Sequence, residues 1–153
     1  MRNAGSLRVR ALRLLAARER SRAELRRKLA DDDAEASEVE GVLDELQREG
    51  LLSETRLAEQ LIHAARGRYG SRRVLERLRS RGLGGEALDR AEQALKVQEL
   101  ESARAVWRKR FDRLPGTLQE KARQARFLAS RGFSNEVIHR ILGRILGAAE
   151  EDQ

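Results

Sequence analysis

Two eight-residue segments of this chain align without gaps at a distance of 50 residues. Residues 81–88 read RGLGGEAL and residues 131–138 read RGFSNEVI. A leucine stands four residues before the glycine in each case, at Leu78 and Leu128. A period of this size, filled by short helices, predicts a tandem array of helical units that resemble helix-turn-helix motifs.

Apolar residues recur at helical spacing along the chain, which predicts an all-α protein. Aromatic residues make up only 3%, and runs of Val, Ile or Thr that favour a sheet are few. Helices are predicted over 7–19, 21–30, 37–48, 53–66, 71–81, 87–95, 98–111, 117–131 and 134–145. They form three repeats of three helices in an elongated, curved array, at 7–52, 53–97 and 98–147, with a flexible start at 1–6 and an acidic tail at 148–153.

Capping residues mark the predicted helix boundaries. Ser21 followed by Glu24 is the signature of a capping box. Further N-caps are predicted at Ser53, Ser71, Thr117 and Ser134, and glycine stops at Gly50, Gly82 and Gly132. In the first repeat Leu29 takes the place of Leu78 and Leu128, and Asp33 stands where the glycine is expected.

The segment from Tyr69 to Leu83 is the most basic part of the chain. Its apolar stripe predicts a short amphipathic helix, and seven arginines stand against one acid between Arg66 and Arg81. Residues 31–49, in contrast, hold nine acids and one arginine, so the net charge of +7 is strongly polarised. The basic helix indicates a surface for a polyanion or an acidic protein. The alternative is a solvated helix whose arginine stems cover apolar neighbours.

Two further basic clusters follow. The first surrounds Trp107, which we expect in the core because apolar residues flank it at helical spacing. Its cations are Arg104, Arg108, Lys109 and Arg110, and those of the second cluster are Lys121, Arg123, Arg126 and Arg131. Arg81 and Arg131 occupy equivalent positions, where pairing with a helix C-terminus is an alternative to binding a partner. For Tyr69, stacking on a base or a partner residue stands beside capping of the turn.

Several classes of site are not indicated. Without cysteine the chain has no disulfide or thiolate metal site, and it has no glycine-rich phosphate loop or nucleophile–base pair. The run Asp31-Asp32-Asp33 lacks the glycine of a calcium loop, since Ala36 stands there, and predicts a solvated loop. His63 and His139 have no ligand-like neighbours in the sequence. We therefore expect no enzyme and no cofactor. The absence of an apolar run for a membrane helix and of a secretory signal predicts a cytoplasmic protein.

Four groups of residues, in this order and spacing, resemble the RecX family. They are Ala11 to Ala16 with Arg20 to Leu29; Glu49 to Glu54 with Arg56 to Ala58; Arg68 to Gly70 with the arginine helix that ends in Gly82 and Leu83; and Lys109 to Phe111 with Lys121, Arg126 to Leu128 and Arg131 to Phe133. The resemblance covers residues 7–146. The chain departs from the family at Leu52, where an aromatic residue is often expected, and at Gln60 and Leu61, where another aromatic residue is missing.

The resemblance implies three tandem three-helix repeats and a non-enzymatic regulator of the RecA recombinase. Such proteins bind along the groove of the RecA nucleoprotein filament, bridging protomers, and inhibit strand exchange, ATP hydrolysis and coprotease activity in DNA repair and the SOS response. Some also bind DNA directly. The partners implied here are the RecA filament and single- or double-stranded DNA, with the chain itself a monomer. The candidate contact residues are Arg66, Arg68, Tyr69, Arg72, Arg73, Arg77, Arg79, Arg81, Arg108, Lys109, Arg110, Lys121 and Arg126.

Two alternatives stay open. One is a transcriptional regulator that reads DNA sequence with a helix-turn-helix unit, but the arginine helix has no Asn or Gln to read base edges, so phosphate contact fits better. The other is a protein scaffold that is indifferent to nucleic acid. Neither alternative predicts an effect on the RecA filament.

Overall fold

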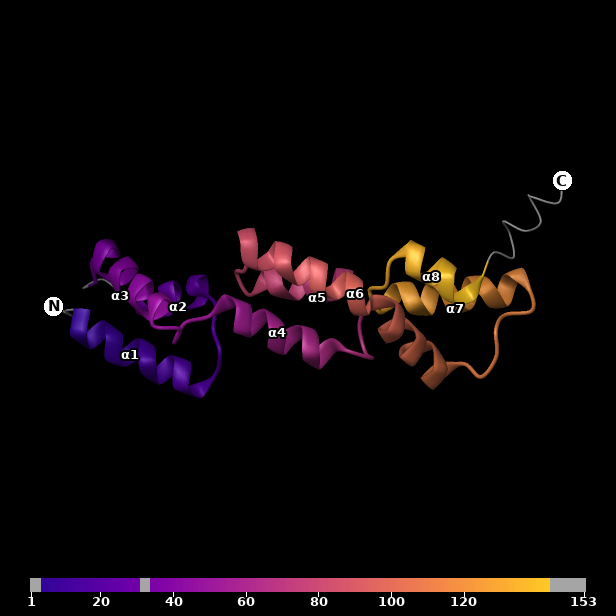
Figure 1. The fold of residues 1–153 in the computed structure, drawn as a ribbon, viewed down its shortest axis with the longest axis horizontal. Coiled ribbons are helices and arrows are strands. Elements are labelled where there is room, and N and C mark those ends of the chain that lie inside the picture. The colour runs from indigo at the N-terminus through magenta and orange to yellow at the C-terminus, as the bar shows by residue number, and fades with distance from the viewer. Residues whose placement is uncertain (1–3, 31–33, 144–153) are drawn as a thin grey trace. The chain divides into compact units, whose positions relative to one another are not determined.

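The computed structural model describes residues 4–30 and 34–143, and within them it is all-helical, as predicted. The helices are α1 (Ala4–Ala17), α2 (Arg22–Leu29), α3 (Ala36–Arg48), α4 (Glu54–Ala65), α5 (Ser71–Ser80), α6 (Gly85–Arg110), α7 (Leu118–Ser130) and α8 (Asn135–Leu142). Figure 1 shows their order along the chain. Asp33, Ile145 and the acidic tail at 148–153 lie outside the described residues.

Two differences from the predicted helices bear on the fold. Helix α1 begins at Ala4, inside the segment predicted to be flexible. Helix α6 is one continuous helix of 26 residues where the sequence predicts two, over 87–95 and 98–111. No Gly or Pro stands between Glu86 and Arg110, so nothing in the sequence breaks the backbone of α6. The apolar face shifts along this one helix. The three repeat boundaries stay a prediction.

The chain divides into two compact units, and this division cuts through α4, α5 and α6. Unit 1 consists of Met1–Gln60 and Arg77–Asp89, and unit 2 of Leu61–Glu76 and Arg90–Gln153. Each unit therefore combines one end of the chain with part of the middle segment.

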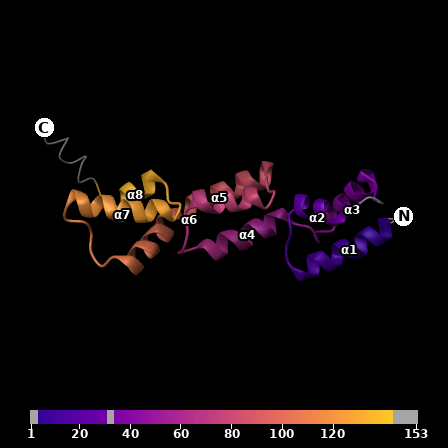
Figure 2. The ribbon, with the colours of Figure 1, turned by 180° about the vertical axis from the view of Figure 1, so that it is seen from behind.

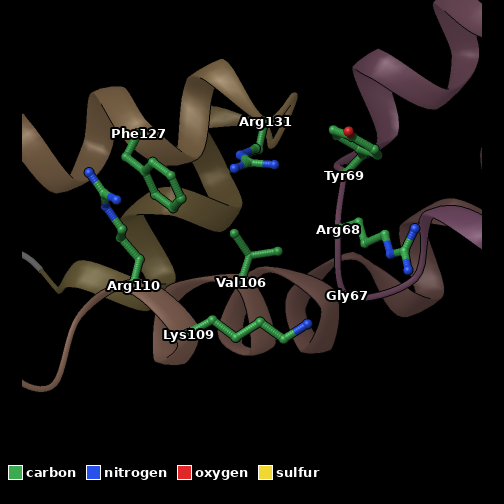
Figure 3. A pocket seen from close by; sticks show the side chains of 8 residues that line it. All are labelled: Gly67, Arg68, Tyr69, Val106, Lys109, Arg110, Phe127 and Arg131. Atoms are coloured by element: carbon green, nitrogen blue, oxygen red, sulfur yellow. The ribbon is translucent and has the colours of Figure 1, made fainter.

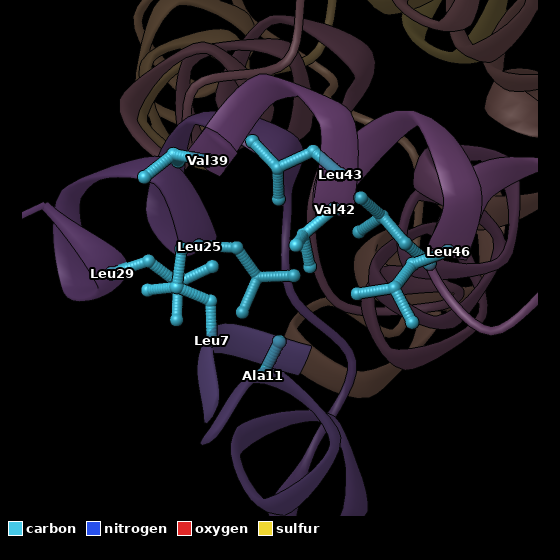
Figure 4. Packing of buried hydrophobic residues seen from close by; sticks show 9 residues of the cluster. Leu7, Ala11, Leu25, Leu29, Val39, Val42, Leu43 and Leu46 are labelled. Carbon is cyan, nitrogen blue, oxygen red and sulfur yellow. The ribbon is translucent and has the colours of Figure 1, made fainter. Parts of the chain in front are cut away.

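The core of unit 1 lies between α1, α2 and α3, which are side by side in both views (Figures 1 and 2). Leucine and valine side chains of the three helices meet in the cluster shown in Figure 4. The predicted capping box begins α2: the Ser21 hydroxyl accepts from the Glu24 N–H over 3.0 Å, and the Ser21 N–H donates to the Glu24 carboxylate over 2.9 Å. This cap fixes where α2 starts against the other two helices.

The core of unit 2 is formed by the C-terminal part of α6 with α7 and α8. Ala103 and Val106 of α6 contact Leu128 and other apolar residues that follow it. Trp107 packs against this cluster, as predicted, and its indole N–H donates to Gln124 over 2.8 Å. The predicted N-caps Thr117 and Ser134 accept hydrogen bonds from the first turns of α7 and α8.

The two glycines of the matched segments close Schellman turns, with φ of +90° at Gly82 and +93° at Gly132. At the second turn the Phe133 N–H donates to the Leu128 carbonyl over 3.3 Å, and both of these side chains are buried. At the first turn the Leu83 N–H donates to the Leu78 carbonyl over 3.1 Å, and these two side chains are buried as well. The leucine four residues before each glycine is thus the hydrophobic partner of the turn.

Each of these turns packs against the first turn of another helix in its own unit. In unit 1 a Cβ atom placed on Gly82 would lie 2.7 Å from Cβ of Ala23, at the start of α2. In unit 2 a Cβ atom on Gly132 would lie 2.6 Å from Cβ of Arg73, at the start of α5. The same packing therefore occurs twice, and both the glycine and its contact residue in unit 2 stand 50 positions after those in unit 1.

The contact in unit 2 predicts that Gly70 does not tolerate a side chain. A Cβ atom there would lie 2.4 Å from the carbonyl carbon and oxygen of Gly132, which are backbone atoms and cannot move aside. We expect Gly70→Ala to lower the free energy of unfolding, measured in urea, by about 1–3 kcal/mol.

Gly116→Ala is the matched control in the same unit. Its Cβ atom would meet nothing closer than a Glu120 carboxylate oxygen at 3.7 Å, so the expected change is within about 0.5 kcal/mol. Equal effects of the two substitutions would contradict the packing described above.

Candidate functional site

A pocket of about 270 Å³ in unit 2 is the candidate functional site, and we call it the basic pocket (Figure 3). Three elements form its walls: the loop before α5, the last turns of α6, and the C-terminal half of α7 with its C-cap residue. Its lining residues are Gly67, Arg68, Tyr69, Val106, Lys109, Arg110, Phe127 and Arg131.

Four of these lining side chains are cations, two are aromatic and none is a carboxylate. Arg68, Lys109 and Arg110 are exposed, whereas Arg131 is half-buried. Converging positive charge in a concave surface raises the local concentration of anions. The arrangement can therefore bind an anionic group through several hydrogen-bond donors at once.

Aromatic rings hold three guanidinium groups in and beside the basic pocket. Arg131 lies between two rings in Figure 3, with its guanidinium carbon 5.9 Å from the centroid of Tyr69 and 5.3 Å from that of Phe127. Arg110 lies 5.5 Å from the centroid of Phe127, and Arg73 lies 4.6 Å from that of Tyr69. These distances are within the range of cation–π attraction, which orients a guanidinium and leaves its N–H edges available.

The C-terminal end of α7 is tied to the start of α5 through four consecutive carbonyl groups, those of residues 129–132. The Arg72 guanidinium donates to the Ala129 carbonyl over 2.7 Å, and that of Arg73 donates to the next carbonyl over 3.3 Å. The Gly70 N–H donates to the Arg131 carbonyl over 2.8 Å, and the Arg72 N–H donates to the Gly132 carbonyl over 3.1 Å. These bonds supply donors to carbonyls at a helix end, where the next turn is missing, and the carbonyl of Ala129 also accepts from the Gly132 N–H.

This contact also moves the start of α5. The sequence predicts Ser71 as N-cap, but Ser71 is the first residue of the helix, and the Val74 N–H donates to the carbonyl of Gly70. The cap falls on Gly70 because only a residue without a side chain fits against the backbone of Gly132.

The structure brings four predicted site residues together in the basic pocket, although the chain separates them by about 40 residues: Arg68, Tyr69, Lys109 and Arg110. The predicted contact residues did not include Phe127 and Arg131, which also line it. Their spacing of four residues on one helix was a usable signal, because it places both side chains on the same face.

The other predicted residues lie elsewhere. Arg66 donates to the Gln98 side chain, and the Lys121 amino group donates to the Gly143 carbonyl over 2.9 Å. Arg72 and Arg73 bond to α7 as described above. Four more are exposed: Arg77 and Arg79 in unit 1, Arg108 and Arg126 in unit 2. Their role as partner contacts stays a prediction.

Arg81 has a defined place in unit 1. Its Nε donates to the Glu24 carboxylate over 2.9 Å and its Nη2 to the Glu19 carbonyl over 3.2 Å, while its own carbonyl accepts from the Ser21 hydroxyl. Burial opposes ionisation of Glu24, but hydrogen bonds from Arg81 and Ser21 outweigh it and lower the pKa of Glu24. The guanidinium of Arg81 thus stabilises the turn on which α2 packs.

The structure shows no further site chemistry in its described part. Among residues 4–30 and 34–143, His, Asp and Glu side chains nowhere gather in a group of three as metal ligands would. Asp31, Asp32 and Asp33 lie outside these residues. Within the same residues, no helix combines the length and apolarity that crossing a membrane requires.

Known proteins are similar to this chain in sequence and in fold. Residues 8–46 match the model of the first three-helix domain of RecX, and residues 97–142 match that of the third. The regulatory protein RecX of Ralstonia nicotianae is 46% identical over 90% of this chain and 86% of its own length. That of Leptothrix cholodnii is 47% identical over 90% of this chain and 87% of its own. The chain belongs to the RecX family.

The crystal structure of RecX from Lactobacillus salivarius superimposes with a TM-score of 0.78 at 18% identity, over 90% of this chain and 93% of that one, and thus shares the fold. One departure from the RecX pattern noted in the sequence can be placed in the structure. Leu52, in place of an aromatic residue, is buried in the core of unit 1. A smaller apolar side chain therefore fills this position without exposing the core.

The pair formed by Glu24 and Arg81 predicts a pH-dependent stability. Since the pKa of Glu24 is lowered by folding, the pair's contribution is fully present above the unfolded pKa of about 4.3 and is lost as pH falls through the folded pKa. Glu24→Gln keeps a capping side chain and removes the charge. We expect it to lower the free energy of unfolding by about 1–3 kcal/mol at neutral pH.

Urea unfolding at a series of pH values tests this, with the difference between wild type and Glu24→Gln shrinking below pH 4. Glu101→Gln is the control, because its pair with Arg104 is exposed and should contribute close to nothing. A difference that stays constant down to the lowest pH would disprove the role of the Glu24 charge.

Proposed function

We propose that this protein binds the RecA nucleoprotein filament and inhibits its recombinase, ATPase and coprotease activities, as a non-enzymatic regulator in DNA repair and the SOS response. Membership of the RecX family, whose curated members are named regulatory proteins, supports the proposal. The basic pocket is the observation that carries it, because a nucleoprotein filament offers the anionic groups that such a pocket attracts. This function implies a protein of the bacterial cytoplasm that acts as a monomer.

Within the predicted contact residues, we assign separate roles. Arg68 and Lys109 line the basic pocket with exposed side chains, which makes them the first candidates for direct contact. Arg72 and Arg73 donate to carbonyls of α7, so their first role is to build the wall of the pocket. Replacing them would disturb both the packing of α5 and the site.

A regulator that reads DNA sequence is less well supported. Reading base edges in the major groove takes side chains such as Asn and Gln beside Arg. The described lining of the basic pocket has neither Asn nor Gln. Its cations can contact backbone phosphates whatever the base sequence.

Inhibition of the DNA-dependent ATPase of RecA tests the proposal. Arg68→Gln combined with Lys109→Gln should raise the concentration needed for half-inhibition by about tenfold. Each Gln can still donate a hydrogen bond to the filament, so only the charge assistance is lost, about 1.4 kcal/mol for the pair. The melting temperature should stay near that of the wild type, because both side chains are exposed. Strand exchange should be affected in the same direction.

Arg27→Gln combined with Lys28→Gln is the matched control. Both residues are exposed on α2 in unit 1, and the pair removes the same charge away from the lining of the basic pocket. This variant should inhibit like the wild type. If the wild-type protein itself left ATP hydrolysis and strand exchange unchanged, the proposed function would be refuted.

A further inference from the structure

We infer that the basic pocket is a phosphate-binding site in which Tyr69 and Phe127 act as positioning residues for the guanidinium groups. The inference deepens the proposed function and rests on it, because these are the residues assigned there to the filament or its DNA. Beyond the proposed function, it specifies that the bound group is a phosphate and that the two rings position the guanidinium groups. Its test uses the protein without RecA.

The charge and the donors of the basic pocket match a phosphate. Three guanidiniums and one ammonium surround a space of about 270 Å³, and no lining residue in the described structure is a carboxylate. The oxygens of a phosphate are arranged tetrahedrally and accept from donors in different directions, whereas the two oxygens of a carboxylate lie in one plane. Guanidinium groups bind phosphates through paired N–H donors, which suits a pocket lined mainly by arginine.

The two rings hold cations and are therefore less suited to stacking on a base. Tyr69 carries Arg73 and Arg131 within 5.9 Å of its centroid, and Phe127 carries Arg110 and Arg131 within 5.5 Å. A guanidinium already oriented in this way loses less conformational freedom when it binds an anion. The rings thus contribute to affinity by fixing the donors of the basic pocket.

The end of α7 does not oppose an anion here. A helix C-terminus carries a partial negative charge on its unpaired carbonyl groups, which would repel a phosphate close to Arg131. In this structure the four carbonyls of residues 129–132 accept hydrogen bonds from residues 70–73. Two of those bonds come from the positive side chains of Arg72 and Arg73, so the local charge favours an anion.

Two sources can supply the phosphate: the backbone of a single nucleic-acid strand, or a free polyphosphate such as a nucleoside triphosphate. Fluorescence anisotropy of a labelled oligothymidylate with the full-length protein measures the first. Unlabelled pyrophosphate as competitor detects the second. A methylphosphonate oligonucleotide, which lacks the backbone charge, separates recognition of phosphate from recognition of the base.

We expect Tyr69→Leu to weaken oligothymidylate binding by about tenfold and Tyr69→Phe to restore it, because the ring and not the hydroxyl holds the arginines. Arg68→Gln with Lys109→Gln should weaken binding to a similar extent. It should also reduce the slope of log K against log salt by about 0.7 for each phosphate that the variant no longer neutralises. This second variant gives the answer if Tyr69→Leu fails to fold, and Arg27→Gln with Lys28→Gln should bind like the wild type.

Displacement of the oligonucleotide by pyrophosphate supports the inference and assigns the site to free polyphosphates. Failure of pyrophosphate to compete, together with weak binding of the methylphosphonate strand, supports it and assigns the site to nucleic acid. The inference is overturned if the wild type binds neither probe, if the methylphosphonate strand binds as tightly as the phosphodiester, or if the pocket variants bind normally. Normal phosphate binding by variants that no longer inhibit RecA would overturn it and leave the proposed function standing. Phosphate binding by a wild type that does not inhibit RecA would refute the proposed function alone.

Discussion

The packing of one helix's last turn on the first turn of another is the contact on which the described structure depends. In unit 2 the carbonyls of residues 129–132 accept from donors at the start of α5, two of them backbone N–H groups and two of them arginine side chains. The negative end of α7 also meets the positive end of α5, which is the favourable order of helix dipoles. Glycine stands at the closest points, Gly70 and Gly132, because the backbones themselves are in contact.

Unit 1 builds the same packing from different groups. The carbonyl of Arg81 accepts from the hydroxyl of Ser21, and the Arg81 guanidinium reaches Glu24 in the first turn of α2. In unit 1 the turn carbonyl thus accepts from the Ser21 hydroxyl, whereas in unit 2 the equivalent carbonyl, that of Arg131, accepts from the backbone N–H of Gly70. The repeat conserves the shape of the contact, set by Gly82 and Gly132, while its hydrogen-bonding groups differ.

Arginine has two kinds of role in this protein, and exposure alone does not separate them. Arg72 and Arg73 are exposed, yet both donate to helix carbonyls. Arg131 is half-buried between two rings, while Arg68 lines the basic pocket with an exposed side chain. Part of the positive charge of this member of the RecX family therefore supports its own fold. The basic pocket forms where arginines that bond to a helix end lie beside cations that line the pocket.

The sequence by itself determined most of the helices, most of their caps and the pairing of equivalent positions, because these depend on local periodicity and on residues close in the chain. It therefore predicted the Ser21 cap, the glycine turns and the place of Trp107. It placed an interruption inside α6, because a change of apolar face resembles a break in the helix although the backbone continues. Only the tertiary structure decided which arginines bond to helix ends and which line a pocket. That distinction depends on residues about 40 to 60 positions apart being brought together, and a local sequence pattern does not specify such contacts.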